Sequence, residues 1–210
     1  MKKKSILAGI LVGVMTLASA CGAMKPEEAK AYTQATLDAV YCGELDEYVR
    51  IVDTTKEEAQ KMYEEGIQLT LEKIGLDEMG ASDEIEEQYK EVVIALAKAA
   101  KYEVGEAVEN EQDGFDVEVT VQPFQGFGDL EDELTNALMK ELKNMDDIPS
   151  DEEINTLTYS LMADLMKESL EDPEYGEATT VTVHVNPDED VVYHIPEEDM
   201  EMIDSALFLM

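Results

Sequence analysis

The chain has 210 residues, of which 50 are Asp or Glu and 15 are Lys or Arg, so its formal net charge at pH 7 is −35. Such a surface repels nucleic acid and anionic lipid, because binding to either depends on Lys and Arg side chains that neutralise phosphates. Nucleic-acid binding is therefore excluded, and the acids predict either a solvated coat or an attraction for cations and cationic peptides.

The first 21 residues have the organisation of a secretory leader. Three lysines at positions 2–4 precede an apolar run at 6–17, and the small residues 18–20 lead to Cys21. The apolar run is too short to cross a membrane as a stable helix, and its pattern is typical of a signal peptide. We predict a signal peptide at 1–20 and export through the general pathway.

Cys21, directly after the small residues, makes the leader resemble that of a bacterial lipoprotein, in which this sulfur is diacylated. Ala18 stands where the lipobox usually has Leu, and Ala18-Ser19-Ala20 also suits the ordinary signal peptidase. Simple secretion and an uncleaved anchor therefore stay open as alternatives. Two acyl chains anchor a protein stably, at about 0.8 kcal/mol per buried methylene. We predict a diacylglyceryl (palmitate-type) anchor on Cys21 that holds the protein on the outer face of the cell membrane.

Cleavage before Cys21 sets the length of the linker and the net charge of the mature protein. Residues 21–26 form the lipidated N-terminus and linker, and at about 3.5 Å per residue the linker spans only about 15–20 Å. The folded part should therefore sit close to the bilayer. Removal of the leader, with its three lysines and no acids, takes the net charge from −35 to −38.

Apolar periodicity then predicts helices in the first half of the chain. Residues 27–41 read as a helix with Gly43 as its stop, and 45–52 as a short helix. Thr55 and Glu58, or Thr54 and Glu57, can form a capping box for a helix that ends at Gly75. Another helix is expected over 82–100.

The period changes to two in the second half. Residues 102–108 and 115–121 predict a hairpin around Asp113-Gly114, and 179–185 with 191–195 predict a second one. Helices are expected at 129–145, 151–170 and 197–208, the second opened by a Ser150/Glu153 capping box. Two hairpins separated by helices indicate one α+β domain at 27–210, with about four antiparallel strands and helices on one face. By analogy it is similar to cystatin-like and NTF2-like folds.

The sulfur-containing side chains carry no strong functional signal. With Cys21 acylated, Cys42 has no disulfide partner, and we expect a free thiol near a helix end. Six methionines in the helices of the second half are expected to fill the core rather than bind copper (Met139, Met145, Met162, Met166, Met200 and Met202).

The two histidines lie in the two strands of the last hairpin. If Val185 pairs with Val191, His184 and His194 share one face of the sheet on a diagonal. With a nearby Glu they could bind a metal. Polar residues on an open sheet face are the simpler interpretation.

The loop of this hairpin also matches part of a calcium-binding pattern. Asn186, Asp188, Asp190 and Glu197 fall at positions one, three, five and twelve, but Val191 occupies the position where the turn requires Gly. We expect a hairpin turn. Because no nucleophile elbow, phosphate loop, zinc-protease or dinucleotide motif is present, we predict no catalytic, cofactor-binding or metal-binding residues.

Three segments resemble a family of uncharacterised Gram-positive surface lipoproteins: Tyr41-Cys-Gly-Glu-Leu-Asp-Glu-Tyr48, Lys101-Tyr-Glu-Val104 and Val117-x-Val-x-Val-x-Pro123. Cys42 departs from the Lys more usual beside that Gly. The resemblance implies an extracellular, lipid-anchored domain of unknown function, and it carries over no catalytic residues.

The anchor and the lack of catalytic motifs together predict a surface lipoprotein without catalysis. We expect it to bind an envelope component, a peptide or a protein through the sheet or a helix-lined groove. Two alternatives stay open. One is a small hydrolase that uses acidic residues in a pocket, and the other is a passive, cation-buffering envelope protein. A deep pocket with converging carboxylates would favour the hydrolase.

Overall fold

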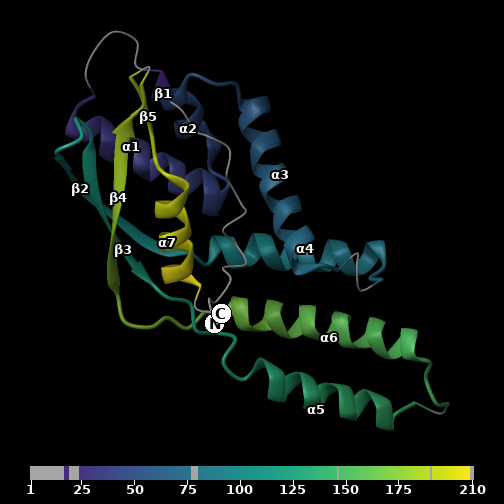
Figure 1. Cartoon of the computed structure of the whole chain (residues 1–210). Coiled ribbons are helices and arrows are strands. Elements are labelled where there is room, and N and C mark those ends of the chain that lie inside the picture. Colours follow the sequence, from purple (N-terminus) through teal and green to yellow (C-terminus); the bar gives the residue numbers. More distant parts are fainter. Residues whose placement is uncertain (1–16, 19–23, 77–79, 146, 190, 209–210) are drawn as a thin grey trace.

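The computed structural model describes residues 17–18, 24–76, 80–145, 147–189 and 191–208. Cys21, the predicted lipidation site, and nearly all of the predicted signal peptide lie outside these residues. The described part forms helices and one antiparallel sheet, so the α+β class is confirmed (Figure 1). Within it, no helix combines the length and the apolar character needed to cross a bilayer.

The sheet has the strand order β1-β5-β4-β3-β2 and contains both predicted hairpins. Its long strands are β2 (Lys101–Glu109), β3 (Phe115–Gln122) and β4 (Thr179–Pro187), and β5 (Val192–His194) is short. The two-residue strand β1 (Leu17–Ala18) pairs with β5 and was not expected, because it falls in the predicted leader.

The first hairpin closes as its sequence predicts. Glu109 pairs with Phe115, and Asp113 adopts a left-handed conformation with φ of 57°. The next position must be glycine, because a Cβ on Gly114 would lie 2.6 Å from the carbonyl oxygen of Val185 in β4. Close approach of two strands therefore fixes this residue.

The expected register of the second hairpin is wrong. Asn186 pairs with His194, whereas Val185 was expected to pair with Val191. The reason is the turn: Val191 takes a positive φ of 62°, and the Asp188 side chain accepts a hydrogen bond from the Val192 N–H at 2.9 Å. The turn therefore occupies residues that were assigned to a strand. The two histidines still share one face, because the shift is by an even number of residues.

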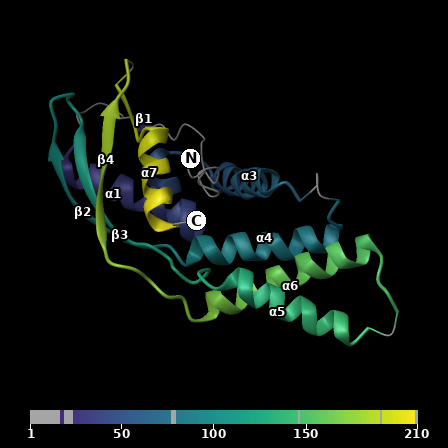
Figure 2. The same cartoon turned by 60° about the horizontal axis from the view of Figure 1, so that its bottom comes forward.

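Two helices, α1 (Pro26–Leu37) and α7 (Glu197–Leu207), cover one face of the sheet, and the figures show the other face uncovered (Figure 2). Alternation along β3 places its valines in this core while its charged residues face outward. Fully buried side chains from the three elements meet there: Tyr32, Leu37, Val117, Val119, Val121, Ile203 and Leu207.

Three further helices extend from α1: α2 (Leu45–Val52), α3 (Lys56–Ile74) and α4 (Asp83–Lys98). The Thr55/Glu58 capping box opens α3, as predicted. Gly43 and Gly75 both adopt the left-handed conformation that ends a helix, as expected. The sequence alone predicted these helix boundaries, because a capping box or a stop glycine depends on residues within one helical turn.

The remaining helices, α5 (Leu130–Lys143) and α6 (Asp151–Glu171), form a hairpin that we call the α5–α6 arm (residues 130–171). The Ser150/Glu153 capping box opens α6, as predicted. The arm projects from the rest of the molecule, with α6 packed beside α4 (Figures 1 and 2).

The expectation that the methionines fill the core is wrong for three of them. Met139, Met145 and Met202 are between 40% and 47% exposed, whereas Met162, Met166 and Met200 pack against the core. The expectation fails for Met139 because α5, the helix that carries it, has no buried residue. Periodicity identifies an apolar helix face, but it does not show how much of that face a neighbour covers.

Candidate binding pocket at the end of the first helix

The candidate site is built where α1 ends. Its last turn widens into a π-helical turn, Asp38–Cys42, and Gly43 follows with φ of 69°. The Asp38 carbonyl accepts hydrogen bonds from the N–H groups of both Gly43 and Glu44. π-Helical turns are rare and are found often at functional sites. The sequence predicted a regular helix to residue 41, so this turn was missed.

Gly43 is required by its surroundings as well as by its φ. A Cβ at this position would lie 3.2 Å from the Tyr63 ring of α3. The Tyr63 ring therefore packs directly on the glycine and fills the space that a side chain at position 43 would need.

A small polar network fixes the Asp38 carboxylate. The Tyr102 hydroxyl of β2 donates to Asp38 Oδ1 at 2.6 Å, and Gln34 Nε2 donates to the same oxygen at 2.8 Å. Cys42 Sγ lies 3.7 Å from the Tyr102 oxygen. The network connects α1, the π-helical turn and the edge strand β2, three segments that the sequence alone could not bring together.

Neither potential nucleophile of this network is activated. Burial raises the pKa of the Cys42 thiol, and the Asp38 and Glu44 carboxylates raise it further against the opposing effect of Tyr102. Burial and the hydrogen bond to Asp38 raise the pKa of Tyr102 far above its ordinary value. Both groups are therefore protonated at neutral pH, and a protonated thiol is a poor nucleophile. Cys42 is a free cysteine near a helix end, as predicted.

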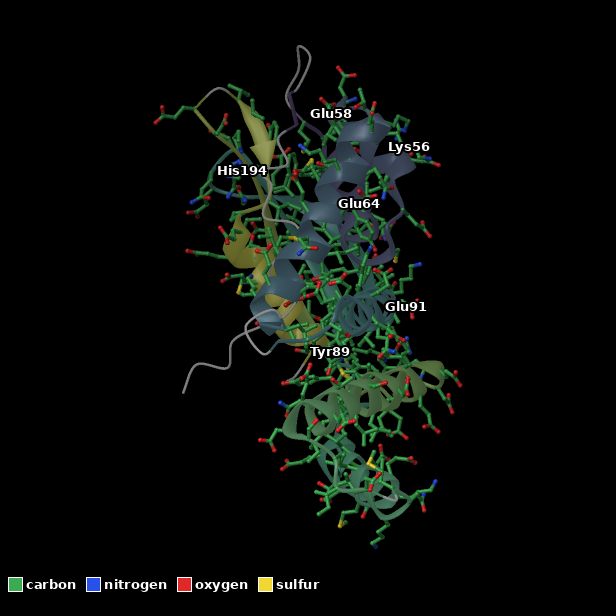
Figure 3. All side chains as sticks on the ribbon, turned by 90° about the vertical axis from the view of Figure 1, so that its right-hand side faces the viewer. Lys56, Glu58, Glu64, Tyr89, Glu91 and His194 are labelled. Carbon is green, nitrogen blue, oxygen red and sulfur yellow. The ribbon has the colours of Figure 1, made fainter. Side chains whose placement is uncertain are left out.

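Beside the π-helical turn lies a pocket of about 550 Å³. Asp46 of its rim forms an ion pair with Lys56 at 2.8 Å, and Glu47 forms one with Arg50. Figure 3 shows Lys56 on α3. The lining combines residues of the π-helical turn, α2 and α3: Asp38, Gly43, Glu44, Leu45, Asp46, Glu47, Lys56 and Gln60. Because Asp46 and Glu47 are paired with basic side chains, the excess negative charge of the lining comes from Asp38 and Glu44, and it favours a ligand with positive charge or hydrogen-bond donors.

The histidines sit elsewhere, with His184 in β4 and His194 in β5, where it pairs with Asn186. Asn186 is the first residue of β4 that pairs with β5, and at His184 the backbone N–H instead donates to Asp199 Oδ2 of α7 at 2.7 Å. His184 Nδ1 lies 2.9 Å from the same oxygen. Asp199 is buried, and its role in completing the edge of β4 had no signal in the sequence beyond its place in the first turn of α7.

Two metal patterns were weighed in the sequence against a plain hairpin, and the described residues do not bring together the ligands of either one. In the described residues, no three His, Cys, Asp or Glu side chains are grouped as ligands of one ion. Of the calcium pattern, Asn186 donates to Gln112, Asp188 binds the Val192 N–H, and Glu197 is the first residue of α7. Asp190 lies outside the described residues. A strand runs through the pattern, as expected for a hairpin.

Comparison with known proteins shows the fold but not a family. No protein-family model and no curated protein matches the chain. One similar solved structure is the crystal structure of YcdA from Bacillus subtilis, a protein that is named as a lipoprotein. The match has a TM-score of 0.62 and 14% sequence identity, and it covers 86% of this chain and 56% of YcdA. At this identity the likeness establishes the shared fold alone, so the family resemblance in the sequence stays a prediction.

Proposed function

We propose that this protein is a lipid-anchored extracellular lipoprotein whose folded part is a non-enzymatic binding module for an envelope component, a peptide or a protein. The leader and Cys21 support the anchor, and the fold shared with YcdA is compatible with it. The pocket beside the π-helical turn supports the binding role.

The pocket is the observation that carries this proposal. Its size admits a side chain or a head group, and its carboxylates suit an amine or another hydrogen-bond donor. A hydrolase would need free carboxylates that converge, but two of the four carboxylates that line the pocket are already paired with basic side chains. The neighbouring Cys42 thiol and Tyr102 phenol are held in their protonated forms, which also favours binding over catalysis. Asp38 is also already committed to Tyr102 and Gln34, which leaves it poorly placed to act as a base.

The anchor is tested with the chain's two cysteines. We expect the wild-type protein to fractionate with membranes and to show a diacylglyceryl mass increment at Cys21. Cys21→Ala should lose both properties. Cys42→Ala is the matched control, because it removes the other cysteine and should leave both unchanged. A free thiol at Cys21 in the native protein would exclude the anchor.

The binding role is tested by photocrosslinking on intact cells. A photoreactive residue at exposed Gln60, on the rim of the pocket, should capture a reproducible species. The same residue at exposed Thr182, on the uncovered sheet face, should not. Equal capture at both positions would indicate a passive acidic coat. Recovery of a cleaved form of the captured species would indicate the hydrolase.

A further inference from the structure

The α5–α6 arm contains an apolar layer that its two helices do not close. On each helix, leucines recur every four residues and therefore share one face. Every one of them remains partly exposed to solvent, and α5 has no buried residue: Leu130, Leu134, Leu138 and Leu142 on α5, and Leu157, Leu161 and Leu165 on α6.

The arm has few neighbours that could cover this layer. α6 uses a different set of residues (Tyr159, Met162, Met166 and Leu170) to pack against the core. α4 is the helix that α6 packs against, and Lys167 binds Glu91 there at 2.6 Å. Figure 3 shows Tyr89 and Glu91 on α4 where it faces α6, with the arm beyond it. The leucine layer is thus left to α5 and α6 alone.

Further exposed apolar side chains lie on α5 and in the segment that joins α5 to α6. Met139 is 47% exposed, Met145 is 40% exposed and Ile148 is 98% exposed. A single exposed apolar residue needs no explanation. Three on one hairpin, beside leucines that are themselves only partly covered, form a surface suited to another helix.

The net charge of the arm indicates what kind of helix this surface would bind. Residues 130–171 contain twelve acids and three lysines, a net charge of −9. A second copy of the arm would be repelled, and so would an anionic membrane. A partner helix with an apolar stripe bordered by Lys and Arg complements both the leucine layer and the surrounding carboxylates.

We infer that the α5–α6 arm docks a basic amphipathic helix of a partner protein, which completes a three-helix bundle with α5 and α6. The partner's apolar stripe covers the leucines and the exposed Met139, Met145 and Ile148, and its basic residues pair with the arm's carboxylates. This surface is separate from the pocket, so the inference does not depend on what the pocket binds.

The test uses a labelled 18-residue helix of Leu and Lys as the probe, titrated by fluorescence anisotropy at 150 mM salt. The full chain carries Cys21→Ala, so that no acyl chain competes for the peptide. We expect saturable binding. The triple variant Met139→Ser, Met145→Ser, Ile148→Ser should weaken it at least tenfold. Its matched control, Leu69→Ser with Val108→Ser, alters exposed apolar residues elsewhere and should not.

Charge is tested in the same way. Glu141→Gln, Asp164→Asn and Glu168→Gln on the arm should weaken binding more than Glu57→Gln, Glu72→Gln and Glu84→Gln on α3 and α4. Equal loss in both sets, or no effect of the triple serine variant, would show general adsorption to an acidic surface and overturn the inference. Absence of binding, or self-association of the chain through the arm, would overturn it as well. Circular dichroism confirms that each variant is folded.

Discussion

Two regions of the molecule have similar proportions of apolar residues but bury them to different degrees. One is the sheet together with α1 and α7, and the other is the α5–α6 arm. Between β3 and α7, valine, isoleucine and leucine side chains are fully buried. In the arm, seven leucines at regular helical spacing stay partly exposed. The sheet, α1 and α7 enclose the first group, whereas α5 packs against α6 alone and α6 packs against α5 and α4. The number of apolar residues in a region therefore does not indicate how much their burial stabilises it, unless the exposed fraction of each side chain is also known.

The largest effect should come from truncating the same side chain in each region. Leu207→Ala in α7 removes a fully buried side chain, and we expect it to lower the free energy of unfolding by about 2–5 kcal/mol. Leu134→Ala in α5 should cost about 1–2 kcal/mol, because its leucine already contacts water and the site can collapse. Urea unfolding followed by circular dichroism measures both. Equal losses would show that the arm is as well packed as the core.

The second comparison is between two glycines that end helices. Gly43→Ala and Gly75→Ala both place a Cβ at positive φ, which costs about 1 kcal/mol. Only at Gly43 would the Cβ also press on the Tyr63 ring, whereas the space around Gly75 is open. We expect Gly43→Ala to be the more destabilising by about 1 kcal/mol or more. Equal unfolding free energies for the two variants would mean that the Tyr63 ring moves aside without destabilising the fold.

The contrast between regions also explains what could be predicted. Capping boxes, stop glycines and the period-two strands depend on residues within a few positions of one another, and the sequence predicted them well. The π-helical turn was missed, because it lies at the very end of the helix and too few residues follow it to reveal a change in the apolar period. Its network with Tyr102 joins residues more than 60 positions apart.

The errors have the same origin. Met139 follows the helical pattern correctly, yet nothing in its own sequence reports that α5 has a neighbour on one side only. The register of the last hairpin depends on Val191 accepting a left-handed conformation, which β-branched residues normally avoid. His184 and its partner Asp199 come from different elements, so their contact required the packing of α7 on β4.

The next prediction concerns the thiol at the π-helical turn. In a chain with Cys21→Ala, alkylation of Cys42 should reach half its maximal rate at a higher pH than in the same chain unfolded in urea. Burial raises the pKa of this thiol in the fold, with Asp38 and Glu44 adding to the effect. By linkage, Cys42 stabilises the fold fully below the pKa of the unfolded thiol, and this is lost as pH rises through the folded pKa.

The control for this profile is Cys42→Ala, whose unfolding free energy should depend less on pH over the same alkaline range. A midpoint at or below that of the unfolded chain would mean that the thiolate is stabilised in the fold. The binding role proposed for the neighbouring pocket would then lose its chemical support, and a nucleophilic role would gain it.

The smallest effect should come from the ion pair that joins the α5–α6 arm to α4. Lys167 of α6 and Glu91 of α4 lie 2.6 Å apart, but Glu91 is 62% exposed and Lys167 is 33% exposed, so water screens the pair. A double-mutant cycle with Lys167→Ala and Glu91→Ala should give a coupling of about 0.2–1 kcal/mol. It should shrink further at 1 M salt, where the screening length is about 3 Å.

The more exposed pair Lys56 and Asp46 serves as the reference and should couple no more strongly. A coupling of several kcal/mol for Lys167 and Glu91 would mean that this ion pair holds the arm against α4. A small one would leave that task to Tyr159, Met162 and Met166, which pack against the core. In that case the leucine layer contributes little to holding the arm in place, and it remains available to the basic helix that we infer.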